Sequence, residues 1–212
     1  MSLPSLVLRY FLYCLWGAVV ALLVTAEAYQ QGTAALYGEH SLVEYLQTTF
    51  LVLVALLFGA AARASAEWRG WCTVLMFVAV TAAVREQDSF FDHNVFDGFW
   101  QLLALAILVA MGGYWWRYPG SVVREAGEFM RSRPAGFLAA GFVTVFVYSR
   151  LIGMQAVWRS MLGDDYRRVV KNFFEETTEL FGYSLLVVAA IETLLVVRAR
   201  LREAGIRSTG AP

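Results

Sequence analysis

Stretches of apolar sequence long enough to cross a bilayer recur along this chain. Residues 6–26 are almost uninterrupted apolar sequence, and a spanning helix needs about 20 such residues because the hydrocarbon core is about 30 Å thick. Lipid offers the backbone no hydrogen-bond partners, whereas a helix satisfies its own backbone groups. We therefore predict an all-α fold, an integral membrane bundle of about six transmembrane helices. Their approximate ranges are residues 6–26, 42–62, 71–88, 99–116, 135–152 and 173–197.

The composition agrees with lipid as the main solvent of this chain. Of the 212 residues, 59% are hydrophobic and 16% are charged, and the mean hydropathy is +0.56. The chain has only 4 prolines and no Ser/Gly-rich run, so we predict no linker and a single polytopic domain over residues 1–212. The formal net charge of zero gives no reason to expect nucleic acid as a partner. Membrane lipids are the expected partners, and the sequence leaves protein partners and homo-oligomers open.

The distribution of basic residues predicts the orientation in the membrane. With about six helices both termini lie on one side, and 11 of the 17 Lys and Arg residues fall on that side. The other six lie mostly in the loop before the last helix. By the positive-inside rule we expect both termini in the cytoplasm. The predicted location is the inner (plasma) membrane of a bacterium, which the chain crosses several times.

The last predicted helix carries carboxylates where hydrocarbon-facing residues are expected. The segment Lys171 to Glu192, KNFFEETTELFGYSLLVVAAIE, has Glu175, Glu176 and Glu179 in its first turns. A charged side chain at the bilayer centre costs about 2.5–3.5 kcal/mol on insertion scales, so these groups need partners, protons or a metal. Glu175, Glu179 and Tyr183 are spaced four residues apart and share one face of the helix.

On this topology most acidic residues and both histidines fall at the outer leaflet. They come from the start of the second helix, the end of the third and the start of the last. Polar faces inside a membrane turn toward one another rather than toward lipid. We therefore predict a carboxylate-rich site near the outer leaflet. Its candidate core residues are Glu44, Glu86, Asp88, Glu175 and Glu179, and the candidate counter-charges are Arg85 and Arg150.

The first interpretation of this site is structural or accessory. Intramembrane charges commonly pair, and such pairs fix the register of helices. In this case Arg85, Arg150, Arg168 and Lys171 neutralise the carboxylates.

The second interpretation is a metal-dependent membrane hydrolase that acts on a lipid-like substrate. His93, Asp92 and Glu179 are candidate ligands of a divalent metal such as zinc, and His40 is an alternative donor. Another carboxylate would then act as the base for a metal-bound water. The chain has no H-E-x-x-H motif, no G-x-S-x-G elbow and no Gly-rich phosphate loop.

The third interpretation is transport of protons or cations, in which Glu44, Glu86 and Glu179 take up and release the ion. A metal-free pair of carboxylates that acts as acid and base on a lipid or isoprenoid is a further alternative. The sequence does not decide among these alternatives, nor whether the protein is an enzyme.

Three local features complete the predicted architecture. Ser41 is expected to cap the second helix, with Glu44 completing a capping box. Trp68, in a loop, is expected as an interfacial anchor. Residues 117–134 place several arginines among apolar residues, a pattern typical of a short amphipathic helix on the membrane surface.

The fifth predicted helix carries small residues that suit close helix packing. Gly136, Ala140 and Thr144 are spaced four residues apart and form one face, and small faces let helix backbones approach closely. Gly141 offers a further point of approach.

Overall fold

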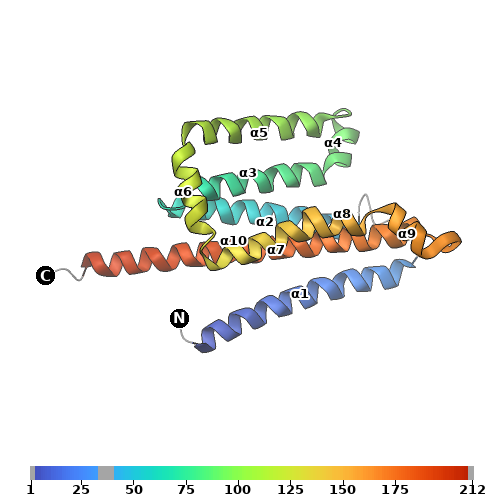
Figure 1. Ribbon diagram of the computed structural model, residues 1–212, viewed down its shortest axis with the longest axis horizontal. Helices are drawn as coiled ribbons and strands as arrows, with labels where there is room; N and C mark the ends of the chain where they lie inside the picture. Colours follow the sequence, from blue (N-terminus) through green and yellow to red (C-terminus); the bar gives the residue numbers. More distant parts are fainter. Residues whose placement is uncertain (1–2, 33–40, 210–212) are drawn as a thin grey trace. The chain divides into compact units, whose positions relative to one another are not determined.

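The computed structural model describes residues 3–32 and 41–209 (Figure 1). These residues are helical apart from short turns and contain no strand, so the all-α prediction is confirmed. In chain order the elements are α1 (Leu3–Gln31), α2 (Leu42–Ala64), α3 (Arg69–Glu86), α4 (Asp88–Asn94), α5 (Phe99–Arg117), α6 (Pro119–Phe129), α7 (Arg133–Val143), the π-helical turn η2 (Thr144–Tyr148), α8 (Ser149–Ile152), α9 (Gln155–Leu162), the 3-10 turn η3 (Gly163–Asp165) and α10 (Arg168–Thr209).

Within the described residues, 5 helical segments are long and apolar enough to cross a membrane. They are Leu3–Gln30, Leu42–Ala64, Phe99–Arg117, Arg133–Ile152 and Arg168–Ala204. The remaining predicted helix, over residues 71–88, corresponds to α3, which has 18 residues and carries charged residues at both ends. Large apolar side chains are exposed along α1 and α5, as expected where the surroundings are lipid rather than water. The chain therefore has the architecture of a helical integral membrane protein.

The chain divides into two compact units, which we describe separately. Unit 1 comprises residues 1–47 and 140–185, and unit 2 comprises residues 48–139 and 186–212. The boundaries fall within α2, α7 and α10, so each unit takes one part of these helices. The assignment of residues 1–212 to a single domain stays a prediction.

In unit 1, hydrogen bonds from side chains tie α1 to its neighbours. The indole Nε1 of Trp16 donates to the hydroxyl of Ser184 on α10 at 2.6 Å. At the other end of α1, the Glu27 carboxylate accepts from the backbone N–H of Leu42 at 2.9 Å. This carboxylate satisfies one of the backbone donors that the start of a helix leaves free, so the end of α1 helps to cap α2.

The predicted cap of α2 is present. The Ser41 hydroxyl accepts a hydrogen bond from the backbone N–H of Glu44 at 3.2 Å, which is the first half of a capping box. The helix consequently begins with Leu42, where the sequence predicted it. His40 lies outside the described residues.

The helix predicted over residues 135–152 contains a π-helical turn that the sequence did not reveal. In η2 the backbone N–H of Ser149 bonds to the Thr144 carbonyl, five residues back. The Ser149 hydroxyl in turn donates to the Val145 carbonyl. The wider π turn keeps Gly141, Val145 and Ser149 together on one buried face.

This buried face packs against Gly182 of α10. A side chain at position 182 would clash with Val145, and its Cβ would lie 3.2 Å from the Gly141 carbonyl oxygen. Gly141 is therefore a point of close approach, as predicted. Gly136 and Ala140 of the small-residue face predicted beside it are exposed, and the close packing of that face stays a prediction.

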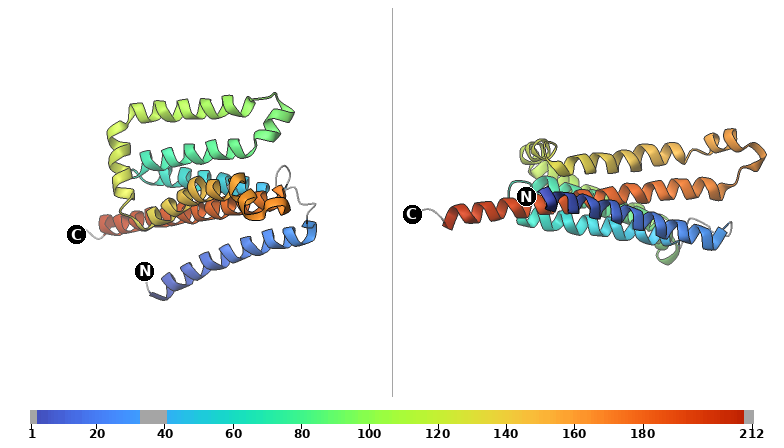
Figure 2. Two further views of the ribbon diagram at one scale, coloured as in Figure 1. Left: turned by 45° about the vertical axis from the view of Figure 1, so that its right-hand side comes forward. Right: turned by 90° about the horizontal axis from the view of Figure 1, so that it is seen from below.

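In unit 2, α3 and α5 lie side by side (Figure 2), with α4 joining them at one end and α6 following α5 at the other. The predicted amphipathic segment is present as α6, and its apolar face is buried within the unit through Val122 and Phe129. Trp68 is also fully buried rather than an exposed anchor. Its ring contacts Phe129 edge-on, and the guanidinium of Arg200 lies 4.3 Å from the ring centre.

The helix boundaries differ from prediction at two places. The third helix ends at Glu86 rather than near residue 88, because Gln87 leaves the helical conformation and its side chain donates to Thr48 at 2.9 Å. The last helix begins at Arg168 and continues to Thr209. Its extra residues at the C-terminal end are rich in Arg and Ala, which are strong helix formers.

Candidate functional site

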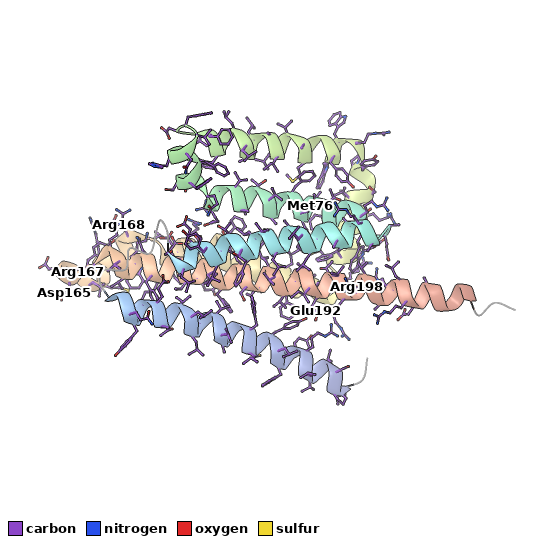
Figure 3. All side chains as sticks on the ribbon, turned by 180° about the vertical axis from the view of Figure 1, so that it is seen from behind. Met76, Asp165, Arg167, Arg168, Glu192 and Arg198 are labelled. Atoms are coloured by element: carbon purple, nitrogen blue, oxygen red, sulfur yellow. The ribbon has the colours of Figure 1, made fainter. Side chains whose placement is uncertain are left out.

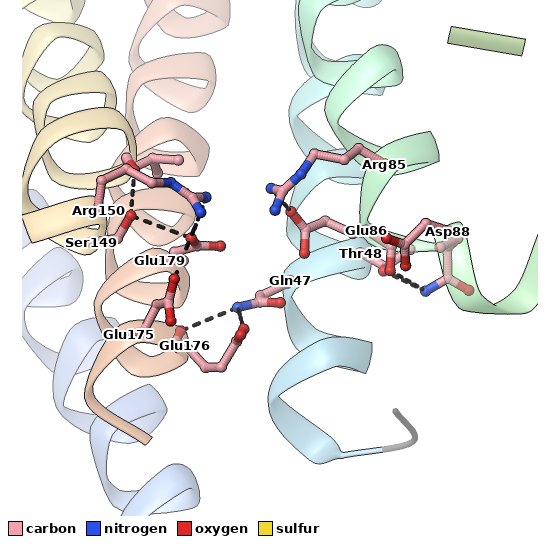
Figure 4. Close-up of polar contacts among 12 residues, drawn as sticks. Gln47, Thr48, Arg85, Glu86, Asp88, Ser149, Arg150, Glu175, Glu176 and Glu179 are labelled. Atoms are coloured by element: carbon pink, nitrogen blue, oxygen red, sulfur yellow. Dashed lines mark hydrogen bonds and ion pairs between the residues drawn. The ribbon is translucent and has the colours of Figure 1, made fainter. Parts of the chain in front are cut away.

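The most densely bonded polar cluster of unit 1 joins α8 to the first turns of α10. Arg150 contacts two carboxylates, that of Glu179 at 2.5 Å and that of Glu175 at 3.7 Å. Lys171 forms an ion pair with the other oxygen of Glu175. The Ser149 hydroxyl lies 3.3 Å from the Glu179 oxygen that Arg150 also binds. We call these five residues the Arg150 network, and Figure 4 shows four of them between the two helices.

The network is buried at Glu179 and open at Arg150. Glu179 is only 2% exposed, whereas 46% of the Arg150 side chain is exposed. Two carboxylates face two cations, so the cluster carries no formal net charge. Because a buried charge is costly unless paired and hydrogen-bonded, this balance explains how carboxylates persist in an apolar helix.

Close contact between the helices brings these charges together. The first turns of α10 place Lys171, Glu175 and Glu179 on one face at four-residue spacing. A Cβ atom at Gly153, just after α8, would lie 2.5 Å from the Glu175 carboxylate. Only glycine leaves room for this carboxylate beside the backbone.

A second contact in unit 1 joins the start of α2 to α10. Gln47 is 1% exposed, and its amide donates to the backbone carbonyl of Glu176 at 3.1 Å and to its carboxylate at 3.0 Å. Glu44 lies one turn earlier in α2 and is half-buried. Glu44 and Gln47 are three residues apart and share one face of α2, and the partner of Gln47 lies on α10.

The candidates of the third predicted helix belong to unit 2, and each makes at least one contact close to it in the sequence. Arg85 pairs with its neighbour Glu86 at 2.8 Å, with side-chain exposures of 47% and 8%. Asp88 is exposed, and its carboxylate accepts from the backbone N–H of Ser89 at 2.6 Å. Because the helix breaks at Gln87, Asp88 opens α4 and does not continue the face of Arg85.

The candidate metal ligands of this region have structural contacts of their own. The Asp92 carboxylate accepts from the backbone N–H of Gly98 at 2.9 Å. Gly98 has a φ of 84° and precedes α5, so Asp92 stabilises a turn that favours glycine. His93 is exposed at the end of α4. Over residues 3–32 and 41–209, no group of three or more His, Cys, Asp or Glu side chains is arranged to hold a metal ion.

The structure thus brings together three of the predicted site residues, Arg150, Glu175 and Glu179. Glu44 lies in the same unit, in the first turn of α2. The other candidates are in unit 2: Arg85, Glu86, Asp88, Asp92 and His93. The convergence of both sets on one site stays a prediction.

Two buried polar residues, Ser149 and Glu125, were not among the site residues predicted from the sequence. Ser149 lies within the Arg150 network and is fully buried. In unit 2, Glu125 is 3% exposed and accepts from the backbone N–H of Trp71 at 2.9 Å, at the start of α3. A carboxylate at a helix N-terminus is stabilised by the helix dipole. The signal for Glu125 was its position between Val122 and Phe129 on the apolar face of an amphipathic segment.

In the Arg150 network every charged group has an oppositely charged partner, and Arg150 is shared between two carboxylates. Such a cluster can fix two helices, or it can exchange its counter-charge for a proton or a cation. Searches against protein-family models, curated proteins and solved structures gave no match.

Proposed function

We propose that this is a multi-pass protein of the bacterial inner membrane, with both termini in the cytoplasm and a structural or accessory role. The observation that carries the proposal is the charge balance of the Arg150 network. Glu179, the most buried of its carboxylates, is bound by both Arg150 and Ser149. A neutral, hydrogen-bonded cluster of this kind holds helices in register inside lipid without a bound ion.

The location of the partners supports a structural role. Arg150 and Ser149 stand at the start of α8, directly after the π turn, and Glu175 and Glu179 stand one turn apart on α10. Each bond of the network except that between Lys171 and Glu175 joins residues from different helices. The network therefore links two apolar helical segments, α8 and α10, through hydrogen bonds and ion pairs.

The test uses purified full-length protein and the Glu179→Gln variant, which removes the buried charge at nearly constant volume. We expect the variant to lose about 2 kcal/mol of unfolding free energy, because it loses a hydrogen bond between charged groups while the half-exposed Arg150 keeps Glu175 as a partner. Elemental analysis of the gently purified wild-type protein should show no stoichiometric metal. Stoichiometric zinc or manganese that disappears in Glu179→Gln would instead establish the metal-dependent hydrolase.

A second candidate, proton or cation transport, is favoured by the position of Arg150. Its half-exposed guanidinium reaches both Glu175 and Glu179, so it can move from one carboxylate while an ion replaces it at the other. Reconstituted liposomes distinguish the two roles. A proton or cation flux that Glu179→Gln abolishes establishes transport, and the structural role requires that wild-type protein give no flux above empty liposomes.

The proposed orientation has its own test. In a background without the free cysteines Cys14 and Cys72, Asp92→Cys should react with a membrane-impermeant maleimide added outside the cell. Arg69→Cys, at the start of α3, is the matched control and should react only after the cells are opened. The reverse pattern would place the termini outside the cytoplasm.

A further inference from the structure

Unit 2 contains an apolar groove between α2 and α3 that the Arg150 network does not use. Its volume is about 450 Å³. The α2 wall includes Val52, Leu56 and Gly59, and the α3 wall includes Met76 and Val80. Met76, labelled in Figure 3, lies on α3 where this helix runs beside α2.

Glycine opens one wall of the groove. Gly59 has no side chain, and a Cβ atom there would lie 3.2 Å from the sulfur of Met76. The groove is open to the surroundings along α2, since Leu56 is 65% exposed and Val52 is 46% exposed. An open apolar channel along two membrane helices has the shape and polarity that suit an acyl chain.

The two ends of the groove differ in charge. At one end the amide of Gln87 donates to the Thr48 hydroxyl at 2.9 Å, so these two polar groups satisfy each other. At the other end stands Arg63, in the last turn of α2. Arg63 is exposed, and in the part of the chain that the structure describes it has no carboxylate partner. The groove thus ends in an uncompensated guanidinium.

We propose that this groove binds one anionic phospholipid, with an acyl chain along α2 and α3 and the phosphate at Arg63. The guanidinium offers paired N–H donors that match phosphate oxygens. From Thr48 to Arg63 the groove extends about 22 Å at about 1.5 Å per residue. One leaflet contributes about 15 Å of hydrocarbon, so an acyl chain that starts at Arg63 is accommodated in full.

The charge of Arg63 selects among lipids. A zwitterionic lipid offers a phosphate together with a cation, which the guanidinium repels, whereas an anionic headgroup offers negative charge alone. Basic positions at the ends of membrane helices bind acidic headgroups on the same basis. The aliphatic stem of Arg63 covers apolar surface while its head reaches the interface.

The experiment measures lipid binding to the full-length protein in detergent by native mass spectrometry. The probes are phosphatidylglycerol and phosphatidylcholine with identical acyl chains. We expect a first phosphatidylglycerol to bind at least tenfold more tightly than phosphatidylcholine. Arg63→Gln should lower the affinity for phosphatidylglycerol about tenfold, the usual effect of losing a charge-assisted hydrogen bond. Its affinity for phosphatidylcholine should not change.

Two matched variants separate the groove from general surface charge. Arg69→Gln removes a neighbouring exposed arginine that does not line the groove, and it should leave binding unchanged. Val52→Trp fills the groove and should weaken both lipids, whereas Leu102→Trp, on exposed α5, should weaken neither. If Val52→Trp does not fold, Leu56→Trp replaces it, because that side chain is more exposed.

Several outcomes would overturn the proposal. Equal losses in Arg63→Gln and Arg69→Gln would show attraction by surface charge without a site. Unchanged binding in folded Val52→Trp and Leu56→Trp would place the lipid elsewhere. Competition by glycerol phosphate at the concentration of the lipid would show a phosphate site that does not need the acyl chain.

Discussion

The acidic residues predicted for the site hold their charges in different ways in the two units. In unit 1, Glu179 is buried and its cation, Arg150, comes from a helix 29 residues away in the sequence. In unit 2, Glu86 pairs with the adjacent Arg85, and the Asp92 carboxylate binds a backbone N–H 6 residues away. In the sequence the two regions look alike, since each is a run of acidic residues with an arginine nearby.

The difference is whether a carboxylate binds a residue that is distant in the sequence or one that is close to it. A pair between distant residues forms only when its two helices pack, so the Arg150 network reports on tertiary structure. A pair between neighbours, or a carboxylate that caps a turn, forms wherever its own helix end forms. The carboxylates of the Arg150 network should therefore control stability, and Asp92 and the pair of Arg85 with Glu86 should control it much less.

The largest expected effect is that of Arg150→Gln. The change leaves Glu179 buried without its cation, and removing one partner of a buried ion pair costs about 3–5 kcal/mol. Since the Arg150 side chain is half-exposed, we expect a loss of about 3 kcal/mol, at the low end of that range. The measurement is equilibrium unfolding in detergent micelles.

Arg85→Gln is the matched control for this loss. Its ion pair is exposed on the arginine side, and such pairs contribute about 0–1 kcal/mol. The comparison between the units fails if both variants lose the same stability. It also fails if Arg85→Gln is the more damaging of the two.

Helical spacing was sufficient to predict part of the Arg150 network. Glu175 and Glu179 fall on one face because α-helical geometry depends only on their spacing. The cost of a carboxylate in lipid required a cation, and Arg150 and Lys171 were among the few available. The spacing argument needs only one helix, whereas the choice of Arg150 rests on charge balance between two helices.

The remaining parts of the site depend on how two helices meet. The π turn at Thr144 changes which residues of the segment face α10, and no local signal marks it. Ser149 lies with Gly141 and Val145 on the face that packs against α10. The break at Gln87 is similar, because its side chain bonds to Thr48 on another helix. Local pattern cannot reveal a contact whose partner lies elsewhere in the chain.

A smaller effect is expected for Gly182→Ala, which tests whether backbone approach positions the Arg150 network. The new methyl group would meet Val145, and the Gly141 carbonyl is 3.2 Å away. Since backbone atoms must then shift, we expect a loss of about 1–3 kcal/mol, typical of an overpacked core. Thermal unfolding in micelles measures it.

The control for this change is Gly136→Ala. This glycine is exposed, and no atom lies within 4 Å of its added Cβ. Alanine has the higher helix propensity, so stability should stay the same or rise by up to about 1 kcal/mol. A Gly182→Ala variant as stable as Gly136→Ala would show that the two segments are not held at this distance.

The smallest expected effect is that of replacing Asp92. The experiment tests whether this carboxylate stabilises unit 2 through its charge. The carboxylate oxygen accepts from the backbone N–H of Gly98, and the amide oxygen of Asp92→Asn can accept the same bond. We therefore expect Asp92→Asn to stay within about 0.5 kcal/mol of wild type, and Asp92→Ala to lose about 1 kcal/mol, as when a helix cap is removed. Denaturant unfolding of both variants decides the matter. If Asp92→Asn loses as much as Asp92→Ala, the charge itself is needed, and Asp92 then resembles Glu179 more than it resembles a cap.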